Sequence, residues 1–119
     1  MSYTHTGKAP VSIRAQPLDA DSTDWVYFVY EEWLRPEESI TKHAAIVSGA
    51  EMVTDSLFIG DMVDDEGVSH SNVYAVQVKP DPTSSEVTIT HRVSTTTTGA
   101  VDLGRLDIDR TVVIAVEVL

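Results

Sequence analysis

Cysteine is absent from the 119-residue chain, and basic residues are scarce, with eight Lys and Arg against 19 Asp and Glu. Without cysteine the chain can form no disulfide bond, no thiolate metal site and no cysteine nucleophile. It also lacks a long apolar run, so no segment is predicted to span a membrane as a helix. The N-terminal region lacks a basic stretch followed by an apolar one, which predicts no signal peptide.

The formal net charge of −11 excludes further classes of partner. Nucleic-acid binding depends on Lys and Arg that displace counterions from phosphates, and a duplex would repel a domain this acidic. Anionic membrane surfaces are disfavoured for the same reason. The acidity is typical of a solubilising surface on an abundant protein, or else of adaptation to a salty medium, and the sequence leaves both interpretations open.

The length and the hydrophobic content of 42% predict one folded domain with its own core. The dominant pattern is a period-two alternation in short runs of β-branched and aromatic residues, separated by turn residues, which is typical of strands. No long helical pattern alternates with these runs, so a parallel α/β sheet is not expected. We predict an all-β fold, a single antiparallel β-sandwich of about seven strands. The predicted strands cover residues 11–15, 25–34, 39–48, 52–59, 72–79, 86–95 and 111–119.

Three of these segments need further interpretation. Residues 39–48 also fit a helical turn at their centre, but Gly49 ends the segment early and strand-forming residues flank it, so we favour a strand. Residues 25–34 are apolar on both faces, which indicates burial on two sides or a covering partner, and we place Phe28 and Trp33 in the core. His91 lies on the apolar face of residues 86–95, so it is predicted to be a neutral, hydrogen-bonded core or rim histidine rather than a metal ligand.

The residue patterns that usually carry catalysis do not occur. The histidines fall in four different segments, no serine stands in a Gly-x-Ser-x-Gly turn, and the dispersed glycines form no phosphate-binding loop. Adjacent carboxylates such as Glu31 and Glu32 point to opposite faces of an extended chain and so do not converge. We therefore predict no catalytic residue, no cofactor and no enzyme activity. The four histidines are His5, His43, His70 and His91.

Acidic loops raise the question of calcium. The segment that starts at Asp19 opens like a helix–loop–helix calcium site, but Asp24 and Tyr30 stand where that motif needs Gly and Glu. The loop at residues 60–67 could instead form an irregular oxygen cage, although we favour solvated turn carboxylates and predict no metal. The residues of that candidate calcium loop are Asp61, Asp64, Asp65 and Glu66.

A set of separated motifs carries a family resemblance. The motifs are Trp33-Leu34 followed by Ser39-Ile40, the stretch Val87-Thr88-Ile89-Thr90-His91-Arg92-Val93-Ser94-Thr95, then Thr98-Gly99, and the ending Asp109-Arg110-Thr111-Val112-Val113-Ile114. In this combination the chain resembles short bacteriophage virion structural proteins with an immunoglobulin-like domain. In that family a Trp-Leu strand end is followed by an acidic turn, and a penultimate strand leads through a Gly turn to an Arg-led final strand. This chain differs in its longer acidic loop at residues 51–71.

The resemblance implies an immunoglobulin-like sandwich at residues 11–119 and a non-enzymatic role as an adaptor subunit at a phage tail or tail-fibre junction. Other virion proteins and further copies of the chain would be its partners, and the virion, assembled in the host cytoplasm, its location. Residues 1–10 are predicted to be a flexible N-terminal arm that orders on a neighbouring subunit. The aromatic segment supplies the interface candidates Trp25, Tyr27 and Tyr30.

Other functions remain open at this point. A capsid decoration (cement) protein would share the same fold and differ in copy number and symmetry. An extracellular β-sandwich module that binds calcium or carbohydrate would use the acidic loop, although no signal peptide is predicted. A small enzyme on a β scaffold would need a cleft with convergent polar groups, which the sequence does not display.

Overall fold

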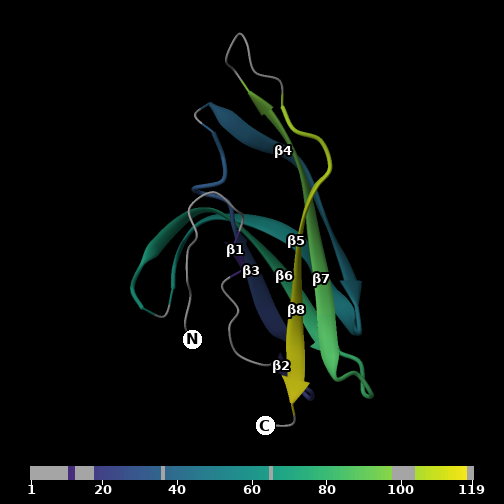
Figure 1. The fold of residues 1–119 in the computed structure, drawn as a ribbon. Helices are drawn as coiled ribbons and strands as arrows, with labels where there is room; N and C mark the ends of the chain where they lie inside the picture. The colour runs from purple at the N-terminus through teal and green to yellow at the C-terminus, as the bar shows by residue number, and fades with distance from the viewer. Residues whose placement is uncertain (1–10, 13–17, 36, 65, 98–103, 118–119) are drawn as a thin grey trace.

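The computed structural model describes residues 11–12, 18–35, 37–64, 66–97 and 104–117 (Figure 1). These residues form eight β-strands, so the predicted all-β class is confirmed. The predicted arm at residues 1–10 lies outside the described residues. The strands are β1 (Val11–Ser12), β2 (Leu18–Asp19), β3 (Asp24–Val29), β4 (Glu38–Ser48), β5 (Ala50–Val63), β6 (Ser69–Pro80), β7 (Glu86–Thr97) and β8 (Ile108–Glu117).

Two sheets pack face to face as a sandwich, which confirms that prediction. The first sheet has the strand order β1-β3-β6-β5 and the second has the order β2-β8-β7-β4. Within each sheet the three long strands run antiparallel to their neighbours. The two-residue strands extend the edges: β1 pairs antiparallel with β3, and β2 pairs parallel with β8.

The core fills the space between the sheets. The predicted inward face of β7 is confirmed, because Val87, Ile89, His91 and Val93 are all buried. Phe28 and Trp33 are buried as well, as the aromatic pattern predicts. Full burial of one such aliphatic or aromatic side chain contributes about 1.5–3 kcal/mol. The buried side chains between the sheets are therefore the main source of stability. The core residues are Leu18, Val26, Phe28, Tyr30, Trp33, Tyr74, Val76, Val78, Val87, Ile89, Val93 and Ile114.

The predicted strand at residues 25–34 is too long. β3 ends at Val29, because the amides of Trp33 and Leu34 both donate to the carbonyl oxygen of Tyr30, at 3.1 Å each, and form a turn. Residues 39–48 are a strand, as favoured over the helical alternative. At the amino end, β1 covers only Val11–Ser12 of the predicted strand 11–15, and β2 lies between the predicted strands 11–15 and 25–34, where no strand was predicted.

The acidic loop is shorter than predicted. Residues 60–63 belong to β5, and the connection to β6 is confined to residues 64–68. Several register shifts between β5 and β6 mark bulges in this pair. In Figure 1 the hairpin that these two strands form curves away from the second sheet.

Gly49 alone connects β4 in the second sheet to β5 in the first. Its φ of +83° lies in the left-handed region that glycine tolerates. A Cβ atom at this position would lie 2.5 Å from the carbonyl oxygen of Glu86. The chain therefore crosses between the sheets at a point where a side chain has no room. No helix of the described residues has the length and apolar character to cross a membrane.

Candidate functional site

A buried histidine joins two loops at one end of the first sheet. His70 lies near the start of β6, with its Nδ1 atom 2.8 Å from Oε1 of Glu31 and its Nε2 atom 2.8 Å from Oδ2 of Asp64. Glu31 belongs to the turn after β3, and its Oε2 atom accepts a hydrogen bond from the Ser71 amide at 2.8 Å. We name Glu31, Asp64 and His70 the His70 cluster. It ties the turn after β3 to the β5–β6 hairpin.

Asp64 holds its position through its own loop. Its Oδ1 atom accepts hydrogen bonds from the amides of Glu66 (2.9 Å) and Val68 (3.0 Å), which is the way Asp side chains stabilise turns. Gly67 completes the loop with a φ of +80°. This arrangement leaves the second carboxylate oxygen directed at His70. The contact between Asp64 and His70 is therefore built locally, from an Asp that opens a tight turn, whereas Glu31 comes from a turn 39 residues away.

The contacts of His70 determine its charge. Burial lowers the pKa of a histidine, but here the hydrogen bonds to Asp64 and Glu31 outweigh burial and raise the pKa of His70 above its ordinary value. The hydrogen bond from His70 also lowers the pKa of Asp64, and the loop amides add to this effect. Two carboxylates as acceptors require both ring nitrogens to donate, which only the imidazolium can do.

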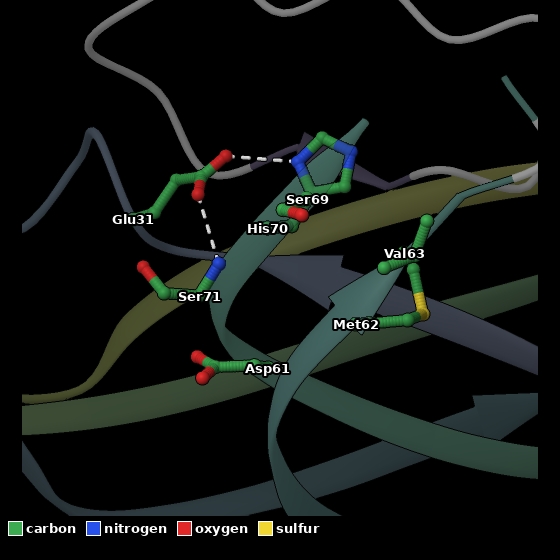
Figure 2. Close-up of a pocket in the computed structure, with 7 residues that line it drawn as sticks. All are labelled: Glu31, Asp61, Met62, Val63, Ser69, His70 and Ser71. Atoms are coloured by element: carbon green, nitrogen blue, oxygen red, sulfur yellow. Dashed lines mark hydrogen bonds and ion pairs between the residues drawn. The ribbon is translucent and has the colours of Figure 1, made fainter. Parts of the chain in front are cut away.

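An open hollow of about 420 Å³ lies beside the His70 cluster (Figure 2). The two carboxylates of Glu31 and Asp61 outnumber the one imidazolium of His70 in this lining, and the resulting negative field favours a cationic group. His70 has both nitrogens engaged, so it has no free lone pair with which to act as a general base. The hollow is therefore better suited to contact a cation than to catalyse a reaction. Its lining residues are Glu31, Asp61, Met62, Val63, Ser69, His70 and Ser71.

The structure separates the residues of the candidate calcium loop. Asp61 lies exposed near the end of β5, whereas Asp64 is buried and turned toward His70. Glu66 is exposed in the loop, and Asp65 lies outside the described residues. Among the described residues, no three or more His, Cys, Asp or Glu side chains are grouped so that they could hold a metal ion.

A second polar group crosses the core between the sheets. The Tyr30 hydroxyl lies 2.6 Å from Nδ1 of His91, and Nε2 of His91 lies 3.3 Å from Nδ1 of His43. The same atom of His43 lies 2.9 Å from Oγ of Ser56 on β5. We name these four residues the inter-sheet chain. It confirms His91 as a hydrogen-bonded core histidine.

The hydrogen-bond directions in the inter-sheet chain follow from the charge states. Burial raises the pKa of Tyr30 far above its ordinary range, so its hydroxyl keeps its proton and donates to Nδ1 of His91. With Nδ1 of His91 as acceptor, its neutral ring carries the proton on Nε2, which faces Nδ1 of His43. Burial, followed by the neighbouring His43, lowers the pKa of His91 to about 3, and burial also lowers the pKa of His43. Both histidines are therefore neutral near pH 7.

A buried ion pair closes the core where the turn after β3 leads into β4. The Arg105 guanidinium donates to both oxygens of Glu38 and packs over the Trp33 ring, 3.7 Å from its centroid. Thr95 donates to Oε2 of Glu38 at 2.5 Å. Burial raises the pKa of a carboxyl, but the hydrogen bonds from Arg105, Arg35 and Thr95 hold the pKa of Glu38 well below its usual range. We name Trp33, Glu38, Thr95 and Arg105 the Glu38 cluster.

Six of the large apolar side chains that the described residues expose lie on β5. None of its 14 residues is buried, and Phe58 leaves 57% of its surface exposed although its ring lies 5.0 Å from that of Tyr74. β5 is an edge strand, so among the described residues one side of its backbone has no neighbour in the sheet. We name the exposed apolar side chains of this strand the β5 row. They are Met52, Val53, Leu57, Phe58, Ile59 and Val63.

The predicted interface residues fall into two groups. Tyr30 is fully buried in the inter-sheet chain, so it cannot anchor a partner and leaves the set of interface candidates. Trp25 and Tyr27 are half-buried on β3, where Tyr27 packs against Val29 and Val73. Sequence reasoning missed the β5 row, because residues 52–59 read as an ordinary strand. Three consecutive large apolar residues, Leu57-Phe58-Ile59, break the period-two pattern and were the available signal.

Comparisons with known proteins add no relative. No family model matches the chain, and neither a curated protein nor a solved structure shows significant similarity to it.

Proposed function

We propose that this chain is a non-enzymatic structural subunit of a bacteriophage particle, an immunoglobulin-like adaptor at the tail or tail-fibre junction. The β5 row is the observation that carries the proposal. Exposed apolar side chains gathered on one edge strand of a folded domain favour protein–protein contact. On this proposal the partners are other virion proteins and further copies of the chain, which is incorporated into the virion in the host cytoplasm.

The strand order supports an immunoglobulin-like topology as part of this proposal. That fold places its first, second, fifth and fourth strands in one sheet and its third, sixth and seventh in the other. The order β1-β3-β6-β5 against β8-β7-β4 corresponds to it, with β1 and β2 as two short halves of the first strand. Phe28 on β3 stacks on His91 of β7, with ring centroids 5.2 Å apart. In antibody domains the inter-sheet disulfide joins the equivalent two strands.

The internal polar groups support a structural role over an enzymatic one. Both ring nitrogens of His70 and of His91 lie within hydrogen-bond distance of other side chains of the domain. A catalytic histidine needs a nitrogen within reach of a substrate proton. These groups instead hold loops and sheets together, which is what a rigid building block requires.

Mass spectrometry of phage particles purified on a density gradient tests the proposal. The chain is expected to band with DNA-filled particles, and its copy number separates a tail ring of a few copies from a capsid decoration protein that follows the whole lattice. Recovery only in the soluble fraction, with known virion proteins banding normally, would contradict a virion role.

A pair of variants links the result to the β5 row. Phe58→Glu places a charge in the row, whereas Val113→Glu makes the same kind of change at an apolar residue of β8 that is 59% exposed. Supplied during particle assembly, Phe58→Glu is expected to be incorporated at least tenfold less than the natural chain, and Val113→Glu at the natural level. Equal incorporation of both variants would remove the β5 row as the contact.

A further inference from the structure

The inter-sheet chain ends at the edge of the sandwich that is least filled. β4 and β5 are in contact along this edge, one in each sheet, and only Gly49 lies between them in sequence. Of the residues in these two strands only Glu38 is buried, whereas β6 and β7 each bury half or more of theirs. A part of a domain with few buried side chains opens at a lower free energy than the core does.

His43 and Ser56 join the two strands of this edge. Nδ1 of His43 on β4 lies 2.9 Å from Oγ of Ser56 on β5, and 3.3 Å from Nε2 of His91 on β7. The His43 ring also packs against the ring of Tyr74 on β6, with their centroids 4.4 Å apart. Farther along, the hairpin of β5 and β6 curves away from the second sheet (Figure 1). One nitrogen atom of His43 therefore holds the middle of β5 against the second sheet.

The positions of the protons decide what this nitrogen can bind. The proton on Nε2 of His91 faces Nδ1 of His43, so a proton on that Nδ1 would oppose it across 3.3 Å. Nδ1 of His43 is therefore an acceptor, to which the Ser56 hydroxyl donates, and the proton of the neutral ring lies on Nε2. An imidazolium carries a proton on each nitrogen and can accept from neither neighbour. The closed edge thus requires a neutral His43.

Burial outweighs the charges around His43. The carboxylate of Asp55 on β5 raises the pKa of His43, but burial lowers it further, to below the ordinary value of 6.5. His91 and Tyr74 face the ring as neutral groups, because burial lowers the pKa of the first and raises that of the second. A hollow of about 180 Å³ beside His43 brings further charged groups near it. The charged side chains around the site are Lys42, Asp55, Arg92, Asp107 and Asp109, which pairs with Arg92.

We propose that protonation of His43 in mild acid opens the β4–β5 edge. A proton from solvent binds Nδ1, and the His43 ring turns outward between the strands. Ser56 and Nε2 of His91 then bond to water that enters the opening. The crossing at Gly49 stays closed, so the strands separate beyond it and uncover the ring of Tyr74. This response goes beyond the proposed function and does not depend on it.

Thiol labelling measures the opening, because the natural chain contains no cysteine. Ala45→Cys places a thiol on β4, opposite His91 and partly buried against the core. Its rate of reaction with 4,4′-dithiodipyridine is divided by that of an unfolded cysteine peptide at each pH, which removes the pH dependence of the thiol itself. Between pH 7.5 and 5.5 this normalised rate is expected to rise threefold to about tenfold, since linkage allows up to about tenfold for each pH unit below 6.5.

Two histidine variants in the Ala45→Cys chain identify the group that takes up the proton. His43→Asn places an oxygen near the position of Nδ1, which accepts from Ser56 but gains no proton, so the rise in acid should disappear. His70→Gln is the matched control at another histidine and should leave the rise intact. Circular dichroism of each variant checks that the domain is folded.

A second thiol separates opening of the edge from global unfolding. Val112→Cys lies on β8, partly buried against the same core. It reacts only when the whole domain unfolds, so at pH 5.5 it should react at least tenfold more slowly than the Ala45→Cys thiol. Equal rates at the two positions would mean that the edge does not open by itself and would overturn the proposal.

Ser56→Ala tests the other side of the contact without altering a histidine. Loss of this hydrogen bond should speed labelling of the Ala45→Cys thiol at pH 7.5 about two- to tenfold, the range that corresponds to the net free energy of one hydrogen bond. Ser48→Ala, at an exposed serine of β4, is the control and should not change the rate. Equal rates in these two variants would show that Ser56 does not hold the edge closed.

The remaining outcomes decide the role of His43. A normalised rate that stays constant between pH 7.5 and 5.5, or a rise that persists in the His43→Asn chain, overturns the proposal. NMR titration of the natural chain gives a check that needs no variant. The ring protons of His43 should shift with a midpoint below pH 6.5, and those of Tyr74 should follow with the same midpoint. Tyr74 signals that do not follow His43 would likewise overturn the proposal.

Discussion

The hydroxyl of Tyr30 lies 2.6 Å from Nδ1 of His91, and both side chains are fully buried between the two sheets. Tyr30 follows β3 in the first sheet, and His91 lies at the middle of β7 in the second. The hydrogen bond therefore joins the sheets at the centre of the core, in a chain that has no cysteine for a disulfide link. His91 continues the contact through Nε2 to His43.

Removal of the Tyr30 hydroxyl should destabilise the fold. Tyr30→Phe leaves Nδ1 of His91 buried without its donor, and an unsatisfied buried polar atom costs about 1–3 kcal/mol. Urea unfolding followed by Trp fluorescence measures the loss. Tyr27→Phe, at a half-buried tyrosine of β3, is the control and is expected to change the unfolding free energy by less than about 0.5 kcal/mol. Equal effects of the two substitutions would show that the hydrogen bond contributes little.

His91 should make the fold sensitive to mild acid. Its pKa is lowered to about 3 in the folded state, so below its ordinary value of 6.5 the unfolded chain binds the proton more readily. Its contribution to stability is therefore lost as the pH falls below 6.5, by up to about 1.4 kcal/mol per pH unit.

The measurement is the unfolding free energy between pH 6.5 and 5, above the range where most carboxyls titrate. His91→Asn keeps an oxygen that accepts from Tyr30 but has no proton to gain, so its unfolding free energy should depend less on pH in this window. The same slope for the variant and the natural chain would assign the acid sensitivity to other groups.

His70 should make the unfolding free energy depend on pH with the opposite sign to His91. Its pKa is raised in the folded state, so its contribution to stability is fully present below its ordinary pKa of 6.5 and is lost as the pH rises through the raised value. His70→Gln removes the charge, and its destabilisation relative to the natural chain should be largest at pH 5.5 and should shrink toward pH 9. A difference that stays constant over this range would mean that His70 is not an imidazolium in the fold.

The Glu38 cluster predicts a third dependence of stability on pH. Glu38→Gln leaves the Arg105 guanidinium without a charged partner in a mostly enclosed site, and breaking a buried pair in this way costs about 3 kcal/mol. The pKa of Glu38 is lowered by folding, so this contribution is present above its ordinary value of 4.5 and disappears as the pH falls. Chemical denaturation should show a larger difference between Glu38→Gln and the natural chain at pH 7 than at pH 3. The neighbouring exposed Glu37, changed to Gln, serves as control.

Local patterning predicted most of the strands but not their ends. Period-two alternation identified the central parts of β4 to β8, and in β4, β7 and β8 the side chains do alternate between a more and a less exposed face. It failed at residues 30–34, where apolar residues belong to a turn that buries Tyr30 and Trp33 from outside the strand. It also failed at residues 60–63, because exposed Asp61 and Val63 lie in an uncovered strand that carries no inward pattern.

The polar clusters depend on tertiary register, which a single sequence does not contain. The chemical nature of His91 was predictable from its apolar neighbours, but its pairing with Tyr30 joins residues that are 61 positions apart. The His70 cluster likewise takes Glu31 and Asp64 from two loops that meet only because β3 and β6 are adjacent in the first sheet. Short-range patterns carry no information about which strands are neighbours.

Gly49 and Gly67 provide a matched pair for backbone strain. Both have a φ near +80°, but a Cβ atom at Gly67 meets nothing within 4 Å, whereas one at Gly49 would lie 2.5 Å from the carbonyl oxygen of Glu86. Gly67→Ala is therefore expected to destabilise the fold only because a residue with a Cβ atom is strained in the left-handed conformation, which costs about 1–2 kcal/mol. Gly49→Ala adds a steric overlap that must displace the start of β7, which brings a further cost of about 1–3 kcal/mol.

Thermal and urea unfolding of the two alanine variants separates these effects, because the conformational cost is common to both. The difference between them measures how rigidly the β4–β5 crossing is held against β7. The Asp81 amide also donates to the Gly49 carbonyl oxygen at 3.1 Å, so the crossing cannot move outward without breaking that hydrogen bond. Equal destabilisation by the two substitutions would show that the crossing yields freely, and the sheets would then be joined through their buried side chains rather than through the backbone at Gly49.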